Sequence, residues 1–530
     1  MQFIPIFLIF IPIFSAMIIY LVHDRRINYL AFVTQITSII LYIVYSKYFI
    51  TIGRKHIFTL GPWNKAIGIT FLIDNLSMVF VALTIFIWTL IILYSWNKRE
   101  HEYKFLFFLL FLEGAFIALL FSNDLFNIFV VLDIITILST ILIIYKKDGF
   151  SVRAGLYYLA FNSVGILFYL LGLILLYSFT GTLNMDTIKI KIEFFRDTSI
   201  VKLSYVFIMA AVGVKSALFP VYNWLPRAHS AAPSGVSALL SGLLVKSGLY
   251  AFIRMNQMFN IDLLNDFFFL LGFVTGFLGV LFALTQKDIK QILAFHTISQ
   301  IGIMLMGISA MEGELLIGGT LHVFNHAIFK TLLFLGAGIL INRYGSRRVT
   351  EIRGVFRDSP IISIFMIIGI LSITGAPLFN GYVSKTIIKH GLYGSSLKVN
   401  MLNLLNLGTI ISFVKFSQIF FGRSYVNKLH HRTSETSIGI LAITCLFLGL
   451  FSKSIMLNLF GIEVSYLNIF DMGYIMDYII NVFLGYIIFK LIIEKDYKII
   501  KKLRHVNLSF STTNIMLITF IAIMILWIKI

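Results

Sequence analysis

Long apolar runs recur along almost the whole chain, and they constrain its fold more than any other feature. Each run has at least about 18 residues, enough to cross the roughly 30 Å hydrocarbon layer of a bilayer as a helix. Hydrophobic residues make up 59% of the 530 residues, more than a water-soluble domain normally holds. Helices satisfy their backbone hydrogen bonds within lipid, whereas isolated strands do not. The sequence therefore predicts an all-α polytopic protein of the cell inner (plasma) membrane.

The runs between charged, Gly and Pro breaks define the predicted spans. We expect about 14–16 transmembrane helices, and the candidate spans are residues 3–22, 29–51, 71–94, 103–122, 124–145, 153–179, 200–220, 234–254, 264–285, 289–309, 315–341, 360–379, 399–421, 436–459, 473–494 and 512–529. Lys and Arg are roughly twice as frequent in the odd-numbered loops, which predicts that these loops are cytoplasmic and that the N-terminus faces outward. The first run lacks the features of a cleaved signal, so we expect it to be retained.

Charge and cysteine content restrict the classes of function. The formal charge is +19, but the basic residues form short clusters between spans, such as 343–357, which is typical of membrane orientation and not of nucleic-acid binding. The only cysteine is Cys445, so an internal disulfide and a thiolate-bound iron–sulfur cluster are excluded. We expect no cofactor in this chain. The polar stretch Glu494 to His505 predicts an interfacial helix.

Two segments interrupt the helical pattern at membrane depth. One runs from Phe219-Pro220 to Pro233, and the other runs from Gly375 to Gly381. Proline removes a backbone hydrogen bond and clashes with the preceding turn, so each segment predicts a discontinuous helix. Irregular backbone at this depth is tolerated where it is buried in protein or lines a wet cavity.

Ionisable residues lie well inside the predicted spans, and they are the candidate proton path: Glu113, Asp133, Lys215, Lys246, His296, His322, His326, Lys330 and Lys415. Insertion of a central Asp or Lys costs about 2.5–3.5 kcal/mol. A packed polar group or a misplaced boundary explains any one of them, but the whole set indicates pairing or function. We expect the lysines, His322 and His326 to lie at mid-membrane depth in one connected polar band.

The spacing of His322, His326 and Lys330 adds information. Residues at i, i+4 and i+8 lie on one helix face over about 12 Å of rise. Such a file of titratable groups suits proton transfer along the helix. A metal site is the alternative, but a lysine in the file and the lack of a further good ligand nearby argue against it.

The buried charges also form a weak internal repeat. Asp133 precedes Lys215 by 82 residues, and Lys330 precedes Lys415 by 85 residues. Each half contains one Pro/Gly break near its second charge. Inverted repeats with broken helices are common in secondary transporters, so we predict two inverted repeats, although two spacings are also compatible with coincidence.

Several motifs in order carry a resemblance to a known family. They are residues 123–127 leading to Asp133, 212–220, 224–229, 232–233, 236–239, 242–248, 288–300, 322–330 and 375–381. The chain resembles, over about residues 70–425, the proton-conducting antiporter-like subunits of respiratory complex I, energy-converting hydrogenases and Mrp-type sodium/proton antiporters. The motifs Asn-Asp-Leu-Phe-Asn and Ser-Gln-Ile-Gly are most similar to the Mrp D-type subunit and its hydrogenase relatives.

The resemblance implies a role for each matching residue. Asp133 takes the place of the carboxylate that pairs with Lys215 on the first broken helix, where the family usually has Glu. Lys246 is then the next relay lysine, His322, His326 and Lys330 form the central connection, and Lys415 is the exit-side charge. The resemblance assigns no role to Glu113 or to the last two spans.

The resemblance also implies an organisation and a function. We expect N-terminal helices in residues 1–110, an antiporter-like translocation core in 111–425 and C-terminal helices in 426–530. The chain would be a non-redox proton- or sodium/proton-translocating subunit of an NADH:quinone oxidoreductase-like, hydrogenase or Mrp-type complex. Its partners would be other membrane subunits, the lipid bilayer, and protons or sodium ions. A stand-alone transporter of a small solute is the alternative, whereas a purely structural anchor would not need buried charges.

Overall fold

The structure is a computed structural model, and it describes residues 1–65, 68–96, 102–423, 432–457, 463–464, 466–506 and 508–529. In this part of the chain, 14 helices are long and apolar enough to cross a membrane. The all-α polytopic fold that the apolar runs predict is therefore confirmed.

The elements follow one another along the chain in three groups. The first contains α1 (Ile4–Val22), η1 (Arg25–Tyr29), α2 (Leu30–Thr51), β1 (His56–Thr59), β2 (Thr70–Ile73), α3 (Asn75–Ser95), α4 (Tyr103–Phe121), α5 (Leu125–Ile144), α6 (Gly149–Thr180) and α7 (Met185–Ile192). The second contains α8 (Ser199–Lys215), α9 (Trp224–Ala231), α10 (Ser234–Leu239), η2 (Leu240–Leu244), α11 (Val245–Phe259), η3 (Asp262–Leu264), α12 (Asn265–Thr285), α13 (Ile289–Ile308) and α14 (Gly313–Tyr344). The third contains α15 (Val355–Asp358), α16 (Pro360–Thr374), α17 (Asn380–Gly391), α18 (Ser396–Phe416), η4 (Ser417–Phe420), α19 (Arg432–Leu450), α20 (Ser452–Ile455), α21 (Met472–Ile488), η6 (Phe489–Ile493), α22 (Lys498–Arg504) and α23 (Phe510–Ile528).

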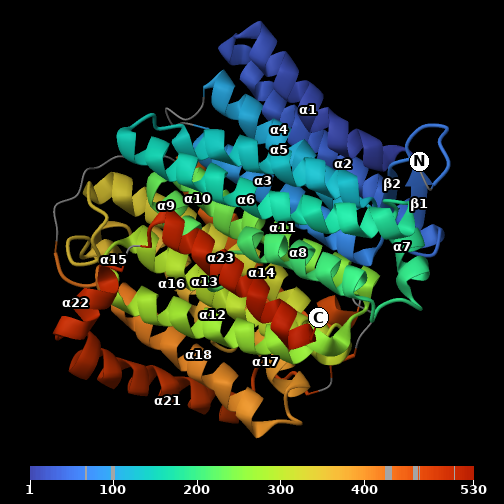
Figure 1. Cartoon of the computed structure of the whole chain (residues 1–530). Coiled ribbons are helices and arrows are strands. Elements are labelled where there is room, and N and C mark those ends of the chain that lie inside the picture. The colour runs from blue at the N-terminus through green and yellow to red at the C-terminus, as the bar shows by residue number, and fades with distance from the viewer. Residues whose placement is uncertain are drawn as a thin grey trace.

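The long helices lie side by side in one bundle (Figure 1). Blue α1 and α2 form one edge, orange-red α18 and α21 form the opposite edge, and α23 returns to the middle, where it packs against α8. A helix occupies each of the 16 predicted spans. The two that fall short of a full crossing are α8, with 17 residues, and α16, with 15 residues. These are the helices that carry the predicted breaks.

The broken helices expose backbone groups that buried side chains then satisfy. After α8 ends, Trp224 Nε1 donates to the carbonyl oxygen of Val214 at 2.9 Å, and the amide of Phe219 donates to Thr275 Oγ1 at 3.1 Å. After α16 ends, Lys385 Nζ donates to the carbonyl oxygen of Ile373 at 2.8 Å. Both predicted discontinuities are present, and each is buried within protein, as irregular backbone in a membrane requires.

Contacts between loops agree with the predicted sidedness. The loop between α12 and α13 follows the ninth predicted span. It pairs with the loops after the eleventh and fifteenth predicted spans, through Asp288 with Arg347 at 2.8 Å and Lys287 with Asp496 at 2.8 Å. These loops therefore share one face of the bundle, which the positive-inside rule assigns to the cytoplasm. A short helix, α22, is present on this face, within the stretch Glu494 to His505.

A short hairpin is the main element that the apolar runs did not predict. Strands β1 and β2 pair antiparallel, with His56 opposite Ile73 and Thr59 opposite Thr70. The span predicted from residue 71 therefore begins later, at Asn75, after Asp74 caps the helix. The hairpin lies between spans, where strand pairing rather than a helix satisfies the backbone.

A bidentate ion pair ties this helix start to the end of α11. Arg254 Nη1 and Nη2 lie 2.6 and 2.8 Å from the two carboxylate oxygens of Asp74, and Arg254 is only 5% exposed. We expect Asp74→Asn to lower the free energy of unfolding by about 2 kcal/mol, because Asn still caps the helix but leaves a buried guanidinium uncompensated. Retention of folded protein in detergent after stepwise heating measures this loss. Asp148→Asn is the control, since Asp148 caps α6 in the same way through Ser151 without a bound arginine, and equal losses in the two variants would contradict the prediction.

Candidate functional site

Lys215 lies at the end of the first half of the broken helix, with only 5% of its surface exposed. The chain leaves the helix immediately afterwards, at Ser216, so the side chain projects into the bundle from the break. Its Nζ donates to Thr136 Oγ1 of α5 at 2.6 Å and lies 6.0 Å from the centre of the Tyr158 ring. The lysine is therefore buried beside one hydroxyl and one aromatic face.

Asp133 does not touch Lys215 in this structure. No ion pair within 4.0 Å joins these two described residues, and the carboxylate is only partly buried. Asp133 does act electrostatically on Lys215, and it precedes Thr136 by three residues on the same face of α5. In place of the expected direct pair, Lys215 has a lysine–hydroxyl contact with Thr136.

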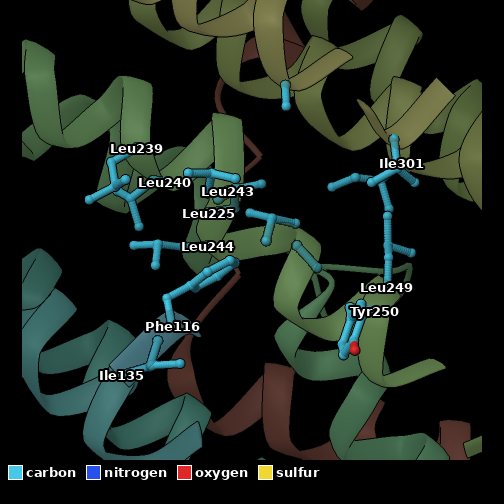
Figure 2. Packing of buried hydrophobic residues seen from close by; sticks show 14 of the residues in the cluster. Phe116, Ile135, Leu225, Leu239, Leu240, Leu243, Leu244, Leu249, Tyr250 and Ile301 are labelled. Carbon is cyan, nitrogen blue, oxygen red and sulfur yellow. The ribbon is translucent and has the colours of Figure 1, made fainter. Parts of the chain in front are cut away.

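A π-helical turn positions Lys246. The turn η2, from Leu240 to Leu244, frees a carbonyl group at Ser241, and Lys246 Nζ donates to that oxygen. The same Nζ lies 2.7 Å from Nδ1 of His326 on α14. Figure 2 shows the leucines of this turn in the hydrophobic packing. The apolar packing fixes the turn, and the turn directs the lysine toward α14.

His322, His326 and Lys330 on α14 contact residues of three other helices, α11, α13 and α17. His322 bonds through Nδ1 to Ser384 Oγ at 2.9 Å and through Nε2 to Gln300 Oε1 at 3.1 Å. His326 contacts Lys246, as described above, and its ring centre lies 6.4 Å from that of His322. All members are fully buried. The predicted single face is present, but His322 and His326 bond to different side chains on other helices and not to each other.

Lys330 connects this file back to the π-helical turn. Its Nζ donates to the carbonyl oxygen of Leu293 at 2.5 Å, and Thr297 Oγ1 donates to the same oxygen at 3.1 Å. Thr297 Oγ1 in turn lies 2.8 Å from Ser241 Oγ. Hydrogen-bonding groups thus run from Lys330 to the segment that holds Lys246.

Buried histidines accompany the lysines. His296 packs against the Phe413 ring at 4.7 Å, and His229 stacks on the Phe334 ring at 4.6 Å. Among the described residues, neither ring of the two has a hydrogen-bond partner. His229 was not among the predicted residues, because it lies in the proline-rich segment between two predicted spans.

Two buried lysines were also absent from the predicted set. Lys385 lies on α17, just after the second break, and is 5% exposed. Lys290 lies in the first turn of α13 and donates to the carbonyl oxygen of Ala232 at 2.9 Å. The one sequence signal for Lys385 was its position just after the Gly375–Gly381 break.

Two predicted members lie apart from the others. Lys415 is near the end of α18 and donates to carbonyl groups at the end of α12, so its expected mid-membrane depth is wrong. Glu113 is fully buried between α2 and α3, where Gln35 Nε2 donates to it at 2.6 Å. No direct hydrogen bond joins Lys215 to Lys246 in the described residues. The expected single band is therefore a central cluster around Lys246 with separate groups on either side.

The ionisable side chains of the central cluster are lysines and histidines. In the described part of the chain, no three His, Cys, Asp or Glu residues gather in a way that could hold a metal ion. Lysine and histidine side chains can each accept and release a proton. The contact between Lys246 and His326 joins two such groups from different helices.

Comparison with known proteins places the chain among membrane transport subunits. The family model "NADH:quinone oxidoreductase/Mrp antiporter, TM" matches residues 122–414. The D-type subunit of the Na(+)/H(+) antiporter of Alkalihalophilus pseudofirmus is 32% identical over 62% of this chain and 67% of its own length. The putative antiporter subunit mnhD2 of Staphylococcus aureus is 30% identical over 75% of this chain and 81% of its own length.

Solved structures share the fold. A chain of the Mrp complex from Dietzia sp. DQ12-45-1b superposes with a TM-score of 0.80 at 22% identity, covering 87% of this chain and 96% of that one. A chain of the membrane-bound sulfane sulfur reductase, an archaeal respiratory membrane complex, gives a TM-score of 0.81 at 24% identity, covering 91% and 100%.

Proposed function

Because the chain belongs to the NADH:quinone oxidoreductase/Mrp antiporter transmembrane family, we propose that it is a proton- or cation-translocating membrane subunit of a multisubunit complex. The names of its relatives favour a cation/proton antiporter of the Mrp type as the finer assignment. A respiratory or hydrogenase complex is the second candidate, and the fold shared with the sulfane sulfur reductase supports it. In either complex, we propose that this subunit carries no redox group and no resident cofactor.

The observation that carries this proposal is the 2.7 Å contact between Lys246 and His326. Both residues are fully buried, and each comes from a different membrane helix. Ionisable groups at such depth are costly and mark ion or proton pathways. A proton on one nitrogen can pass directly to the other, which is the step that translocation requires.

We propose a path that uses the groups around this contact. Lys215 exchanges a proton near Asp133 on one side, the Lys246–His326 pair carries it through the centre, and His322, Lys330 and Lys385 continue the path. His296 and His229 are candidates for intermediate sites. Small rearrangements at the two broken helices would open and close the gaps between these groups, because the backbone at each break is held by side-chain hydrogen bonds that can exchange rather than by a continuous helical ladder.

The solute-transporter alternative requires a roomy polar cavity at mid-membrane depth. The cavity beside Lys215 has a volume of about 10 Å³, which holds roughly one water molecule at most. A larger cavity of about 560 Å³ lies between α16, α18 and the outer helix α21, and its lining is mainly apolar, including Ile370, Phe413 and Tyr486. The space beside Lys215 and the apolar lining of the larger cavity therefore favour proton transfer over transport of a polar solute.

The proposed function predicts coupled ion movement by the assembled complex. We expect vesicles containing the complete complex to show proton movement driven by a sodium gradient, or by electron transfer if redox subunits co-purify. A pH-sensitive dye in the vesicle interior measures this movement. Vesicles with the complex lacking this chain are the control. Transport of an uncharged solute by this chain alone, without ion coupling, would contradict the proposal.

A further inference from the structure

Two cations hold the carboxyl end of α12. Lys415 Nζ donates to three of the four carbonyl oxygens of residues 283–286, at 3.0, 2.7 and 2.5 Å. The remaining one, on Thr285, accepts from Arg504 Nε at 2.6 Å. Carbonyl groups at a helix end lack partners within the helix and carry partial negative charge, so they favour nearby cations. The last turn of α12 is thus shared between α18 and the connector that contains α22.

Asp496 holds one of these cations in place. Its carboxylate accepts from both Nη atoms of Arg504 and from Lys287 Nζ at 2.8 Å. The hydrogen bond from Arg504, together with that from Lys287, lowers the pKa of Asp496 to about 2. The carboxylate therefore stays charged at physiological pH, and it acts by positioning its partners rather than by carrying protons.

A cavity of about 120 Å³ lies beside this cluster. A water molecule needs roughly 10–15 Å³ of such volume, so the cavity has room for several. Lys415 lines it together with the cations Lys287 and Arg504 and the carboxylates Glu494 and Asp496. These are the charged groups around the Lys415 amine, and they lie on the face that the positive-inside rule assigns to the cytoplasm.

We propose that this cavity is the cytoplasmic mouth of the translocation path, and that Asp496 is a positioning residue that keeps Lys415 at the mouth. The proposal rests on the proposed function. Asp496 fixes Arg504 on the carbonyl of Thr285, which leaves the other carbonyl groups of this turn to Lys415. Asp496 lies outside residues 122–414, the part that the family model matches. The C-terminal connector therefore completes the path of the matched core.

Lys415 exchanges a proton with water at the mouth. Neutral Lys415 accepts a proton from hydronium, so that an N–H bond forms, an O–H bond breaks and a water molecule remains. Release to the cytoplasm reverses this transfer. The cations Lys287 and Arg504 oppose protonation at the mouth, and Asp496 compensates their charge.

The test compares proton flux by the assembled complex with two substitutions of Asp496. We expect Asp496→Asn to lower flux by about tenfold, because Arg504 and Lys287 lose their charge-assisted hydrogen bonds to the carboxylate. The flux–pH profile should shift to lower pH, because the charge of the two cations is then no longer compensated and opposes protonation of Lys415. Asp496→Glu should restore most of the flux and the original profile. The matched control is Asp266→Asn, which breaks the ion pair with Lys398 (2.8 Å) that joins the same two helices, α12 and α18, at their opposite ends; its flux and profile should remain those of the wild type.

A second measurement does not depend on flux. Cys445 is buried and is the only cysteine, so a Lys415→Cys chain offers one new thiol to a charged, membrane-impermeant thiol reagent. We expect labelling from the cytoplasmic side only. The proposed cytoplasmic mouth would be refuted by the absence of cytoplasmic labelling. It would also be refuted by a wild-type flux and pH profile in an assembled Asp496→Asn complex. If the wild-type complex moves no ions while the thiol is labelled as expected, the proposed function fails instead.

Discussion

In Lys246→Met, we expect ion translocation by the assembled complex to fall on the order of 100-fold, the typical contribution of a positioned proton-transfer group. Methionine keeps the length of the side chain but cannot hold a proton, so His326 loses its only transfer partner among the described contacts. Folding should survive, because the leucines of the π-helical turn keep their packing. Dye-detected flux in vesicles, normalised to the amount of assembled complex, measures the effect.

Lys191→Met provides the comparison for that result. Lys191 also donates to a backbone carbonyl group, that of Thr180 at 2.6 Å, but it lies on α7, away from the buried cluster. Its substitution should leave flux unchanged. A second variant, His326→Gln, keeps a hydrogen-bonding group near Lys246 and should lose flux as Lys246→Met does. Near-normal flux in either of the two cluster variants would show that the path bypasses this contact.

The sequence was sufficient to predict the bundle and its breaks. Apolar length alone locates a membrane helix, because each crossing must satisfy every backbone group internally. Pro220 and Pro377 also located the discontinuities, since proline prevents the regular hydrogen bond wherever it lies. These are local properties of the chain, and the structure shows both.

The contacts of the buried groups could not be predicted in the same way. Lys385 follows the second break on a helix of 12 residues, which is too short and too polar to indicate a span, so its burial is not evident from the sequence. Lys415 lies inside an apolar run, but its depth depends on where α12 ends beside it. The burial of Lys385 and the depth of Lys415 were missed for the same physical reason. The depth of a side chain is set by neighbouring helices that are distant in sequence.

The expected pair of Asp133 and Lys215 shows the same limit. The family resemblance implies that the two residues pair, but Thr136 makes the direct contact with Lys215 at 2.6 Å. Whether a carboxylate or a hydroxyl reaches a lysine depends on how the helices that carry them are placed against each other. Motif spacing does not resolve this placement.

Substitution of Asp133 is the most informative test of how Lys215 works. We expect Asp133→Asn to lower flux on the order of 100-fold, because Asp133 is the carboxylate that acts electrostatically on Lys215. Asp133→Glu should keep or raise the wild-type flux, since the longer side chain can reach Lys215 directly. Flux in vesicles at matched assembly measures both.

Thr136→Val separates the roles of the charge and the hydroxyl. Valine matches threonine in shape but removes the group that Lys215 contacts, so if the hydroxyl only holds the lysine at rest, flux should change by less than about threefold. A large loss in Thr136→Val together with wild-type flux in Asp133→Asn would mean that the hydroxyl carries the proton and that the aspartate is structural. We expect a large loss in Asp133→Asn and a small one in Thr136→Val, because a neutral hydroxyl cannot stabilise a buried ammonium as a carboxylate does. Alternation between a stabilised and an unstabilised Lys215 is what drives a proton onward.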